Sequence, residues 1–313
     1  MYNLVFLDAK TVGRDLDLMK FNNLANVKIY DFSDPNEVPE RISDADIVVV
    51  NKVPMNESTL ANSSKLKLIC VTATGVDNLD REYLDKRGIE WRNVAGYSTE
   101  CVAQHTFSLF FYLWEHLSYY DGYVKNGGYV GDKSFSHFEK IFHEIYGKKW
   151  GVIGLGAIGR RVSEIARCFG FEVQYYSTSG KNHSNDVKEV DLNTLLFSSD
   201  VVSVHCPLSE KTRNLINSDT LKKMKKEAIL LNLARGPVVD EEALTDALND
   251  GTIAAAGLDV LSKEPMSADN PLFAIKDSDK LLITPHIGWA AKETRIRLMD
   301  TIYGQIEDFL ARL

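Results

Sequence analysis

The chain has 313 residues, 44% of them hydrophobic, which is enough to fill the cores of two domains. Its formal net charge of −8 gives no broad positive field, which argues against a nucleic acid or an anionic membrane surface as partner. The first residues lack a basic segment followed by a long apolar one, and no window reaches the length of a membrane span, so we expect a cytoplasmic protein. The cysteines lack C-x-x-C or zinc-type spacing, and His137 and His143 lack further ligands at metal spacing. Neither disulfides nor a metal site is therefore expected.

The first 93 residues alternate short apolar runs with polar stretches that suit helices, which predicts a small α/β unit with a largely parallel sheet. The expected strands are 4–7, 27–30, 47–50, 66–72 and 89–92. After the fourth strand comes the loop 73–78, and a helix is expected to start near Asp77. Open α/β sheets bind ligands in loops at the carboxyl ends of strands, so this loop is a candidate site, although an ordinary turn fits it equally well.

A long helix and an irregular segment follow. Residues 99–120 carry apolar side chains at helical spacing, with Ser98 or Thr99 as N-cap, and predict one helix. Residues 121–147 contain five glycines and many aromatic residues but show no clear period. The helix would lead the chain into a second domain.

The stretch 149–170 predicts a strand, a glycine turn and an amphipathic helix. Gly154, Gly156 and Gly159 have the spacing G-x-G-x-x-G. In a dinucleotide-binding turn one glycine makes the bend, one lets a pyrophosphate approach the backbone and one lets the helix pack on the strand. With the run 150–153, later apolar runs make six expected strands, the number in a dinucleotide-binding sheet. These runs are 172–176, 201–205, 228–233, 254–260 and 280–284.

Three charged residues stand just after strands of this second half. Arg235, Glu264 and His286 follow the runs 228–233, 254–260 and 280–284, respectively. Because the carboxyl ends of parallel strands meet at one edge of a sheet, these side chains can converge on one cleft. Taken alone, Arg235 could form a surface ion pair, Glu264 could be a solvated loop residue, and His286 could be a capped strand end. Together they indicate a catalytic group.

The last stretch, 291–313, predicts one amphipathic helix. Its apolar stripe consists of Ile296, Met299, Ile302, Ile306 and Phe309. Since no strand follows, we expect this helix to return to the first domain. The expected domains are therefore a discontinuous substrate-binding domain, residues 1–97 with 288–313, and a dinucleotide-binding domain, residues 98–287.

Five segments resemble the signature segments of the D-isomer-specific 2-hydroxyacid dehydrogenases. They are the glycine motif, HCPLSEKTRNLIN (205–217), NLARGPVVDEEAL (232–244), AAAGLDVLSKEP (254–265) and TPHIGWA (284–290). The resemblance spans essentially the whole chain. It implies two Rossmann-like α/β domains, one with a six-stranded parallel dinucleotide-binding sheet and a smaller, flavodoxin-like one for the substrate. It also implies an NAD(P)-dependent oxidoreductase that interconverts a 2-oxo acid and a D-2-hydroxy acid, as a homodimer.

By the same resemblance, Arg235 binds the substrate carboxylate and carbonyl, His286 is the acid/base, and Glu264 pairs with His286. The backbone at Thr74, Gly75 and Val76 would help to seat the substrate carboxylate, and Asp259 would hold the nicotinamide amide. The other residues assigned to the cofactor are Thr106, Gly154, Gly156, Ala157, Ile158, Gly159, Ser177, Thr178, Cys206, Pro207, Thr212 and Ala234.

The chemistry of the reaction supports these three catalytic assignments. Reduction of a 2-oxo acid develops negative charge on the carbonyl oxygen, and a proton must arrive there. A histidine side chain, with a reference pKa of about 6.5, can hold or release a proton near neutrality. A neighbouring carboxylate stabilises the imidazolium and fixes its tautomer. Arginine offers two parallel donors to a planar carboxylate, a geometry that lysine cannot copy.

The choice between NAD(H) and NADP(H) stays open. An NAD-selective site has an acidic residue just after its second strand, which binds the ribose hydroxyls and repels a 2′-phosphate. Here the second strand ends at Tyr176, Ser177 to Lys181 follow, and no Asp or Glu occurs between Val173 and Asn185. Lys181 suits a phosphate but is equally consistent with a solvated loop.

The substrate is also open. The stretch NVAGYSTECVAQHT (93–106) resembles the equivalent segment of glyoxylate and hydroxypyruvate reductases (glycerate dehydrogenases), so these acids are the first expectation. Gln104 departs from the acidic residue often found at its position. A D-lactate dehydrogenase and a D-2-hydroxyacid dehydrogenase of the branched-chain type are alternatives. A non-catalytic NAD(H)-sensing regulatory protein is disfavoured by the negative net charge and by the complete set of Arg235, Glu264 and His286.

Overall fold

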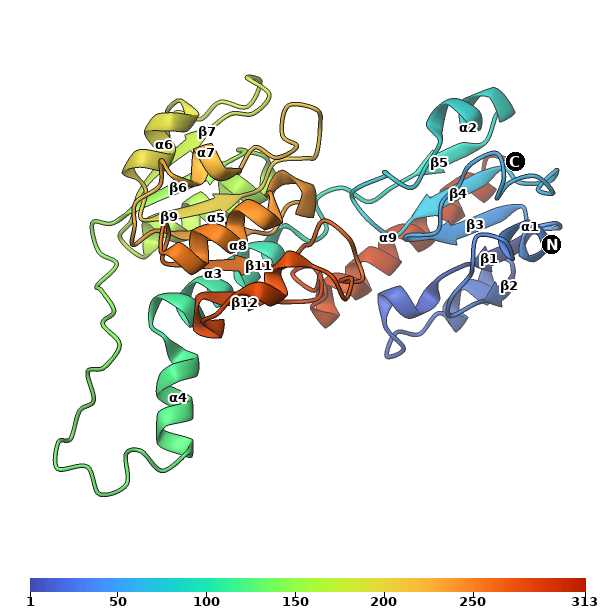
Figure 1. The fold of residues 1–313 in the computed structure, drawn as a ribbon. Coiled ribbons are helices and arrows are strands. Elements are labelled where there is room, and N and C mark those ends of the chain that lie inside the picture. Colours follow the sequence, from blue (N-terminus) through green and yellow to red (C-terminus); the bar gives the residue numbers. More distant parts are fainter. The chain divides into compact units, whose positions relative to one another are not determined.

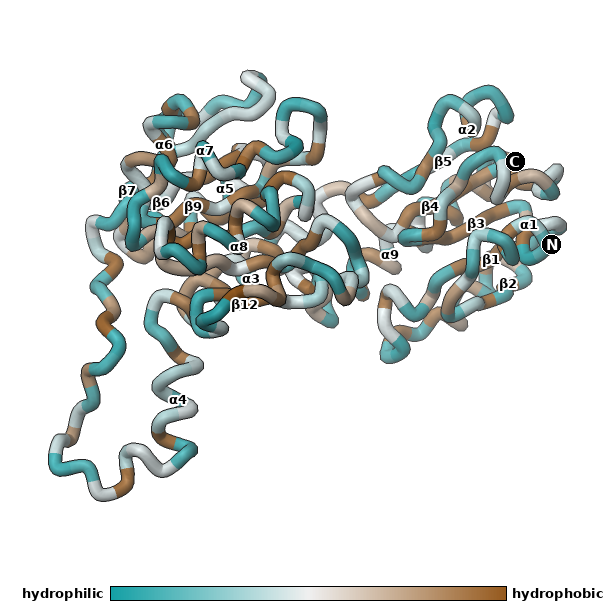
Figure 2. The backbone as a smooth tube through the Cα atoms, viewed as in Figure 1, coloured by the Kyte–Doolittle hydropathy of each residue, from teal (hydrophilic) through white to brown (hydrophobic).

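The computed structural model describes residues 1–313, which form two compact units. The N-terminal unit consists of Met1–Ser98 together with Ala290–Leu313, and the second unit is Thr99–Trp289. Each unit is built around one parallel sheet (Figure 1), and the most hydrophobic stretches run along the strands of both sheets (Figure 2). No helix of either unit is both long enough and apolar enough to cross a membrane.

The sheet of the N-terminal unit has five strands in the order β2-β1-β3-β4-β5, which is the order of flavodoxin-like folds. They are β1 (Asn3–Phe6), β2 (Asn26–Ile29), β3 (Ile47–Val50), β4 (Leu68–Val71) and β5 (Glu90–Arg92). The central strands β3 and β4 read IVVV and LICV and are buried throughout, as expected for parallel strands covered on both faces. The predicted flavodoxin-like fold of this unit is confirmed.

Three α-helices belong to the N-terminal unit: α1 (Val38–Arg41), α2 (Arg81–Arg87) and α9 (Lys292–Leu310). The helix expected to start near Asp77 begins instead at Arg81. It begins there because the Asp80 carboxylate caps it, accepting a hydrogen bond from the backbone N–H of Tyr83 at 3.1 Å.

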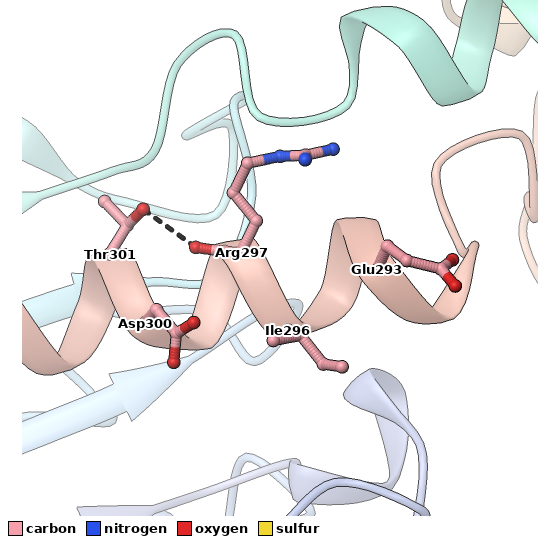
Figure 3. A pocket seen from close by; sticks show the side chains of 5 residues that line it. All are labelled: Glu293, Ile296, Arg297, Asp300 and Thr301. Atoms are coloured by element: carbon pink, nitrogen blue, oxygen red, sulfur yellow. Dashed lines mark hydrogen bonds between the residues drawn. The ribbon is translucent and has the colours of Figure 1, made fainter.

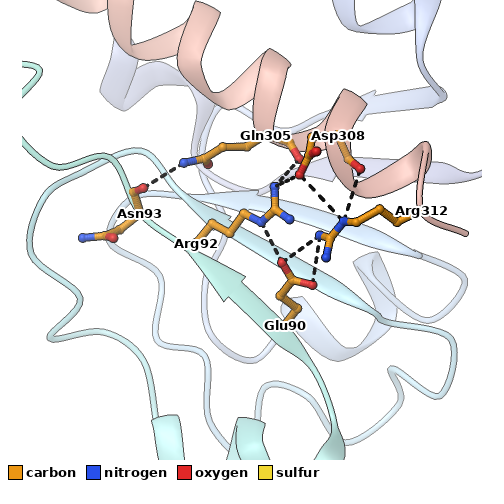
Figure 4. Close-up of polar contacts among 6 residues, drawn as sticks. All are labelled: Glu90, Arg92, Asn93, Gln305, Asp308 and Arg312. Atoms are coloured by element: carbon orange, nitrogen blue, oxygen red, sulfur yellow. Dashed lines mark hydrogen bonds and ion pairs between the residues drawn. The ribbon is translucent and has the colours of Figure 1, made fainter.

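Helix α9 packs into the N-terminal unit through a buried stripe that includes Leu298, Met299, Ile302, Ile306 and Phe309. Polar contacts anchor its last turns to β5. Arg92 donates to the Gln305 carbonyl at 2.7 Å and pairs with Asp308, and Arg312 pairs with Glu90 (Figure 4).

Ile296 does not belong to the stripe, contrary to the prediction. It is 42% exposed and lines a shallow pocket on the open face of α9 with Glu293, Arg297, Asp300 and Thr301 (Figure 3). Each step of three residues turns the side chain by roughly 60° around a helix, so Ile296 lies roughly 120° from Ile302.

The sheet of the second unit has seven parallel strands in the order β12-β11-β10-β9-β6-β7-β8. They are β6 (Lys149–Ile153), β7 (Glu172–Tyr176), β8 (Lys188–Glu189), β9 (Val201–Val204), β10 (Ile229–Asn232), β11 (Ala255–Leu258) and β12 (Leu281–Ile283). Counted from β6, the order is 3-2-1-4-5-6 with one strand added, which is the dinucleotide-binding order. The predicted number of six was one too low, because β8 is two exposed charged residues without an apolar run.

Helices cover both faces of this sheet. Helices α3 (Thr99–Trp114) and α5 (Ala157–Cys168) share one apolar cluster with the fully buried Trp150 of β6. The cluster on the other face contains residues of α6 (Leu192–Ser198), α7 (Ser218–Leu221) and α8 (Glu241–Asp250). The sheet therefore lies between two helical layers, and its strand ends are the places open to ligands.

The helix predicted for 99–120 is two helices. It is interrupted at His116, whose φ of 53° is left-handed, and the chain continues as α4 (Leu117–Lys125). Apolar periodicity cannot reveal a single residue of this kind, so the break was missed. Together α4 and residues 126–146 form an arm that projects from the rest of the unit (Figure 1).

Candidate active site

The glycine turn joins β6 to α5 and has the shape that a pyrophosphate requires. Gly154 has a φ of 94°, and a Cβ on Gly159 would lie 2.1 Å from the Gly154 carbonyl oxygen, so helix and strand pack closely here. A Cβ on Gly156 would meet nothing within 4 Å, and no side chain caps α5. The first N–H groups of α5, including those of Ala157 and Ile158, thus lie at an open helix N-terminus. The turn fits a dinucleotide.

The neighbouring strand β9 borders this turn. A Cβ on Gly154 would lie 2.8 Å from backbone atoms of Cys206, which directly follows His205. Burial raises the pKa of the Cys206 thiol to about 11, so it is neutral. Thr212 is buried, and its hydroxyl donates to the Pro207 carbonyl at 2.7 Å. Thr212 therefore holds the loop that starts with Cys206 and Pro207.

On the other side of β6, strand β7 ends at Tyr176, and Ser177 follows it. The Gly154 N–H donates to the Tyr176 carbonyl at 2.9 Å, which ties the end of β7 to the glycine turn. The hydroxyl of Ser177 is buried and has no hydrogen-bond partner, while Thr178 is half-buried. A buried hydroxyl is usually bonded, so the Ser177 Oγ fits a site that binds a polar ligand atom.

Arg235 lies in a tightly packed turn after β10. The Asn232 side chain secures this turn: its Oδ1 accepts from the Ala234 N–H at 3.1 Å and its Nδ2 donates to the Arg235 carbonyl at 3.0 Å. A Cβ on Gly236 would lie 1.9 Å from the Leu261 carbonyl carbon, so only glycine lets the turn approach the loop after β11. The Arg235 loop thus packs directly against the loop that carries Glu264.

Glu264 and His286 are in contact. His286 Nδ1 lies 2.7 Å from Glu264 Oε2, and the other carboxylate oxygen accepts from the Leu261 N–H at 3.0 Å. The side chain of His286 is 26% exposed and that of Glu264 is 33% exposed, so both are partly shielded from water but still accessible. His286 has a φ of 55°, an uncommon left-handed conformation. An imidazole bonded through Nδ1 can use Nε2 to exchange a proton.

The backbone around His286 is held by Asp259, at the end of β11. Oδ1 of this carboxylate accepts from the Thr284 hydroxyl at 2.6 Å and from the Ile287 N–H at 2.9 Å, and Oδ2 accepts from the Gly288 N–H at 2.7 Å. Burial raises the pKa of Asp259, but these hydrogen bonds and one assigned to His105 outweigh burial and leave the pKa below its ordinary value. A carboxylate has about four acceptor positions, so one remains on Oδ2.

Sequence reasoning missed two supporting residues, His105 and Glu241. Nε2 of His105, on α3, lies 2.9 Å from the Thr284 hydroxyl. Glu241, the first residue of α8, is buried and accepts from the Ser262 N–H at 2.6 Å. No local pattern marks these residues, because their partners are distant in the chain. His105 lies within the resemblance segment 93–106, but the segment alone does not indicate its contact with Thr284.

The remaining candidates are spread over both units. Ala234 is buried beside Arg235, and Thr106 is fully buried on α3, where its hydroxyl donates to the Val102 carbonyl. Thr74, Gly75 and Val76 belong to the N-terminal unit, in the loop after β4, where the Thr74 hydroxyl donates to the Val94 carbonyl at 2.9 Å. The structure thus gathers Arg235, Glu264, His286 and Asp259 at the carboxyl ends of β10, β11 and β12.

Comparison with known proteins agrees with this geometry. Residues 107–288 match the family model "D-isomer specific 2-hydroxyacid dehydrogenase, NAD binding domain". The chain is 38% identical to a glycerate dehydrogenase of Methylorubrum extorquens, over 98% of the chain and 96% of that protein. It is 37% identical to a hydroxypyruvate reductase of Blautia hydrogenotrophica, over 95% of the chain and 92% of that protein.

Solved structures show the same likeness. The structure of D-lactate dehydrogenase from Aquifex aeolicus, complexed with NAD and lactic acid, superposes with a TM-score of 0.86 at 28% identity and covers 99% of this chain and 96% of that one. The predicted resemblance, the class of enzyme and the nicotinamide dinucleotide as cofactor, without a choice between NAD(H) and NADP(H), are confirmed. The chain belongs to the D-isomer specific 2-hydroxyacid dehydrogenases, a family of NAD-binding oxidoreductases.

Proposed function

We propose that this enzyme reduces a small 2-oxo acid, hydroxypyruvate or glyoxylate in the first place, to the D-2-hydroxy acid. The observation that carries the proposal is the 2.7 Å contact between His286 Nδ1 and Glu264 Oε2. The loop that contains Glu264 also packs against the turn that contains Arg235. The names of the relatives, glycerate dehydrogenase and hydroxypyruvate reductase, support these substrates.

Arg235 is the residue that would bind the substrate. Its guanidinium presents parallel N–H donors, which match a planar carboxylate and can also polarise the neighbouring carbonyl. One donor, Nη1, bonds to the Ala234 carbonyl at 2.8 Å, which orients the group. The Asn232 bonds to the same turn restrict its backbone, so the donors are held ready before the substrate arrives.

His286 would supply the proton. A dinucleotide, when bound, would supply the hydride for the carbonyl carbon. Glu264 accepts from Nδ1 of His286, which leaves Nε2 as the position from which a proton reaches the developing alkoxide. The carboxylate also stabilises the imidazolium before transfer, and in the oxidative direction it stabilises the imidazolium that forms.

The other assignments remain part of the proposal. The glycine turn, Ser177, Thr178 and the Cys206–Pro207 loop would hold the dinucleotide, and Asp259 would bind the nicotinamide amide through its remaining acceptor position. Thr74, Gly75 and Val76 are proposed for the substrate carboxylate from the resemblance alone. On this view the discontinuous N-terminal unit is the substrate-binding domain, and the second unit is the dinucleotide-binding domain.

D-Lactate dehydrogenase is the second candidate, favoured by the structural likeness to the Aquifex enzyme complexed with NAD and lactic acid. A reductase for branched-chain 2-oxo acids belongs to the same alternative. Steady-state rates with hydroxypyruvate, glyoxylate, pyruvate and 2-oxoisocaproate, each with NADH and NADPH, test these possibilities. The proposal expects the highest kcat/KM with hydroxypyruvate or glyoxylate. A higher value with pyruvate or 2-oxoisocaproate contradicts it, and tight nucleotide binding without turnover of any acid would support a sensor.

The homodimer is also a proposal, with the arm formed by α4 and residues 126–146 as its interface. The arm exposes apolar side chains that water solvates poorly: Val124, Tyr129, Val130, Phe135, Phe138, Ile141, Phe142 and Tyr146. Light scattering should give twice the chain mass of 35.2 kDa. The double variant Phe135→Ser/Phe138→Ser should shift the mass to that of the monomer. Phe197→Ser, on α6 and also exposed, should not. A monomeric wild-type protein overturns the proposal.

A further inference from the structure

The loop after β7, residues 177–183, lies where the adenosine ribose of the dinucleotide is expected. The hydrogen bond from Gly154 N–H to the Tyr176 carbonyl joins the start of this loop to the glycine turn. In an NAD-selective fold an acid stands here, and it can only accept hydrogen bonds. This loop has instead the buried, unpartnered hydroxyl of Ser177, which can donate as well as accept.

A cation from helix α5 contacts this loop. Arg160 lies in the first turns of α5, directly after Gly159, and its Nη2 donates to the His183 carbonyl at 2.7 Å. The guanidinium is exposed and is not paired with a carboxylate, which leaves most of its donors unused. The next residue, Arg161, differs: it pairs with Glu100 at 2.9 Å and Glu164 at 3.1 Å.

The carboxylate that contacts this loop, that of Glu189, is already engaged. Oε2 of Glu189, on β8, accepts from the Tyr175 hydroxyl at 2.9 Å and lies 3.1 Å from His183 Nδ1. Its hydrogen bonds with His183 and Tyr175 are the main causes that lower the pKa of Glu189, so it is ionised and its charge is directed toward these partners. Arg160 and Lys181 are both exposed and form no ion pair, so their charges are available to a ligand at this loop.

We propose that Arg160, with Lys181 and the hydroxyls of Ser177 and Thr178, forms a subsite for the 2′-phosphate of the cofactor, so that NADP(H) binds at least as tightly as NAD(H). A guanidinium binds a phosphate through two parallel charged hydrogen bonds, and hydroxyl donors complete its coordination. No carboxylate of the loop opposes the added charge. The inference rests on the dinucleotide site of the family and not on the substrate proposed above.

The test measures binding of cofactor fragments that lack nicotinamide, so it is independent of turnover. Isothermal titration calorimetry should show that the wild type binds 2′-phospho-ADP-ribose at least as tightly as ADP-ribose. Arg160→Gln should weaken binding of 2′-phospho-ADP-ribose by about tenfold or more, the usual effect of losing a charged hydrogen bond, and leave ADP-ribose unchanged. Raising the salt concentration should weaken the binding of 2′-phospho-ADP-ribose more than the binding of ADP-ribose.

Two further variants make the test specific. Arg161→Gln removes an arginine charge at the next position in the chain. It should leave both affinities unchanged, because Arg161 is already paired with Glu100 and Glu164. Thr178→Asp should weaken binding of 2′-phospho-ADP-ribose much more than binding of ADP-ribose, because the new carboxylate repels the 2′-phosphate. The proposal is overturned if the wild type binds ADP-ribose more tightly than 2′-phospho-ADP-ribose, or if Arg160→Gln and Arg161→Gln have equal effects. Because no 2-oxo acid is present, neither result bears on the proposed substrate.

Discussion

The carboxylate of Asp259 holds the backbone of Gly288, whose N–H donates to Oδ2 at 2.7 Å. The other oxygen binds the Thr284 hydroxyl and the Ile287 N–H. His286 lies between these anchored residues, and its left-handed φ of 55° is maintained by them. One buried carboxylate thus determines where the imidazole points.

Asp259→Asn should lower both activity and stability. An amide offers one acceptor oxygen where the carboxylate offers two, so one N–H donor at Ile287 or Gly288 loses its partner. We expect the free energy of unfolding at pH 7 to fall by about 1.5–3 kcal/mol, the usual value of a charged hydrogen bond, and kcat to fall because His286 is less well oriented. Urea unfolding and steady-state rates measure the two effects, with the exposed Asp250→Asn as control.

The pH dependence of this variant follows from the lowered pKa of Asp259. A carboxylate with a depressed pKa stabilises the fold above its unfolded value, about 3.9, and the contribution is lost as pH falls through the folded value. The stability difference between wild type and Asp259→Asn should therefore be constant near neutrality and shrink below about pH 4. A difference that grows on acidification would contradict the assignment.

His286→Asn should reduce turnover by about 10²- to 10⁴-fold, the usual contribution of a positioned acid. Asparagine tolerates a left-handed φ, so this change removes the imidazole with little backbone strain. Fluorescence titration with NADH and NADPH should give wild-type affinities. A near-normal turnover would remove His286 from the mechanism, and lost nucleotide binding would point to a structural role.

Glu264→Gln should lower kcat for reduction. The carboxylate lies 2.7 Å from His286 Nδ1 and orients the ring through a charge-assisted hydrogen bond. The neutral amide forms a weaker hydrogen bond, so the imidazole should be held less well for proton transfer. The measurement is the steady-state rate at fixed pH, with Asp269→Asn on the same exposed loop as control. An unchanged kcat for Glu264→Gln would count against the pairing.

Two glycines of the turn should respond differently to alanine. Gly156 has a φ of −78° with open space around it, so Gly156→Ala should fold normally but weaken dinucleotide binding, because the methyl group occupies the approach of the pyrophosphate. Gly159→Ala places a Cβ 2.1 Å from the Gly154 carbonyl and should destabilise the fold by about 1–3 kcal/mol or more. Thermal unfolding and NADH titration separate the two. Equal stability of both variants would contradict the packing argument.

His205→Leu should make the fold less sensitive to acid. Both ring nitrogens of His205 are buried without partners, and burial lowers its pKa to about 3. The unfolded chain takes up this proton near pH 6.5, so stability is complete above that pH and is lost progressively as pH falls toward 3. Between pH 6 and 4 the wild type should lose about 1.4 kcal/mol per pH unit more than His205→Leu, measured by urea unfolding. Parallel stability curves would refute this.

Apolar runs predicted most of the fold because buried parallel strands leave a strong local signal. The five strands of the first sheet and six of the second were expected near their observed bounds. Two features were not predicted, and in each case the apolar pattern of the sequence gives no signal. β8 is a charged two-residue edge strand, and the break at His116 is one residue with a positive φ.

The sequence by itself determined the family, the α/β architecture and the positions of Arg235, Glu264 and His286 just after strands. Each of these features depends only on short, contiguous stretches of residues. The roles of these three residues stay predictions. Only the tertiary structure revealed that Asp259 anchors the residues around His286 and that His105 reaches Thr284, 179 positions away. It also revealed that Arg160 bonds to the His183 carbonyl in the loop after β7. Hydrogen bonds between distant segments depend on strand order and register, and no local pattern encodes them.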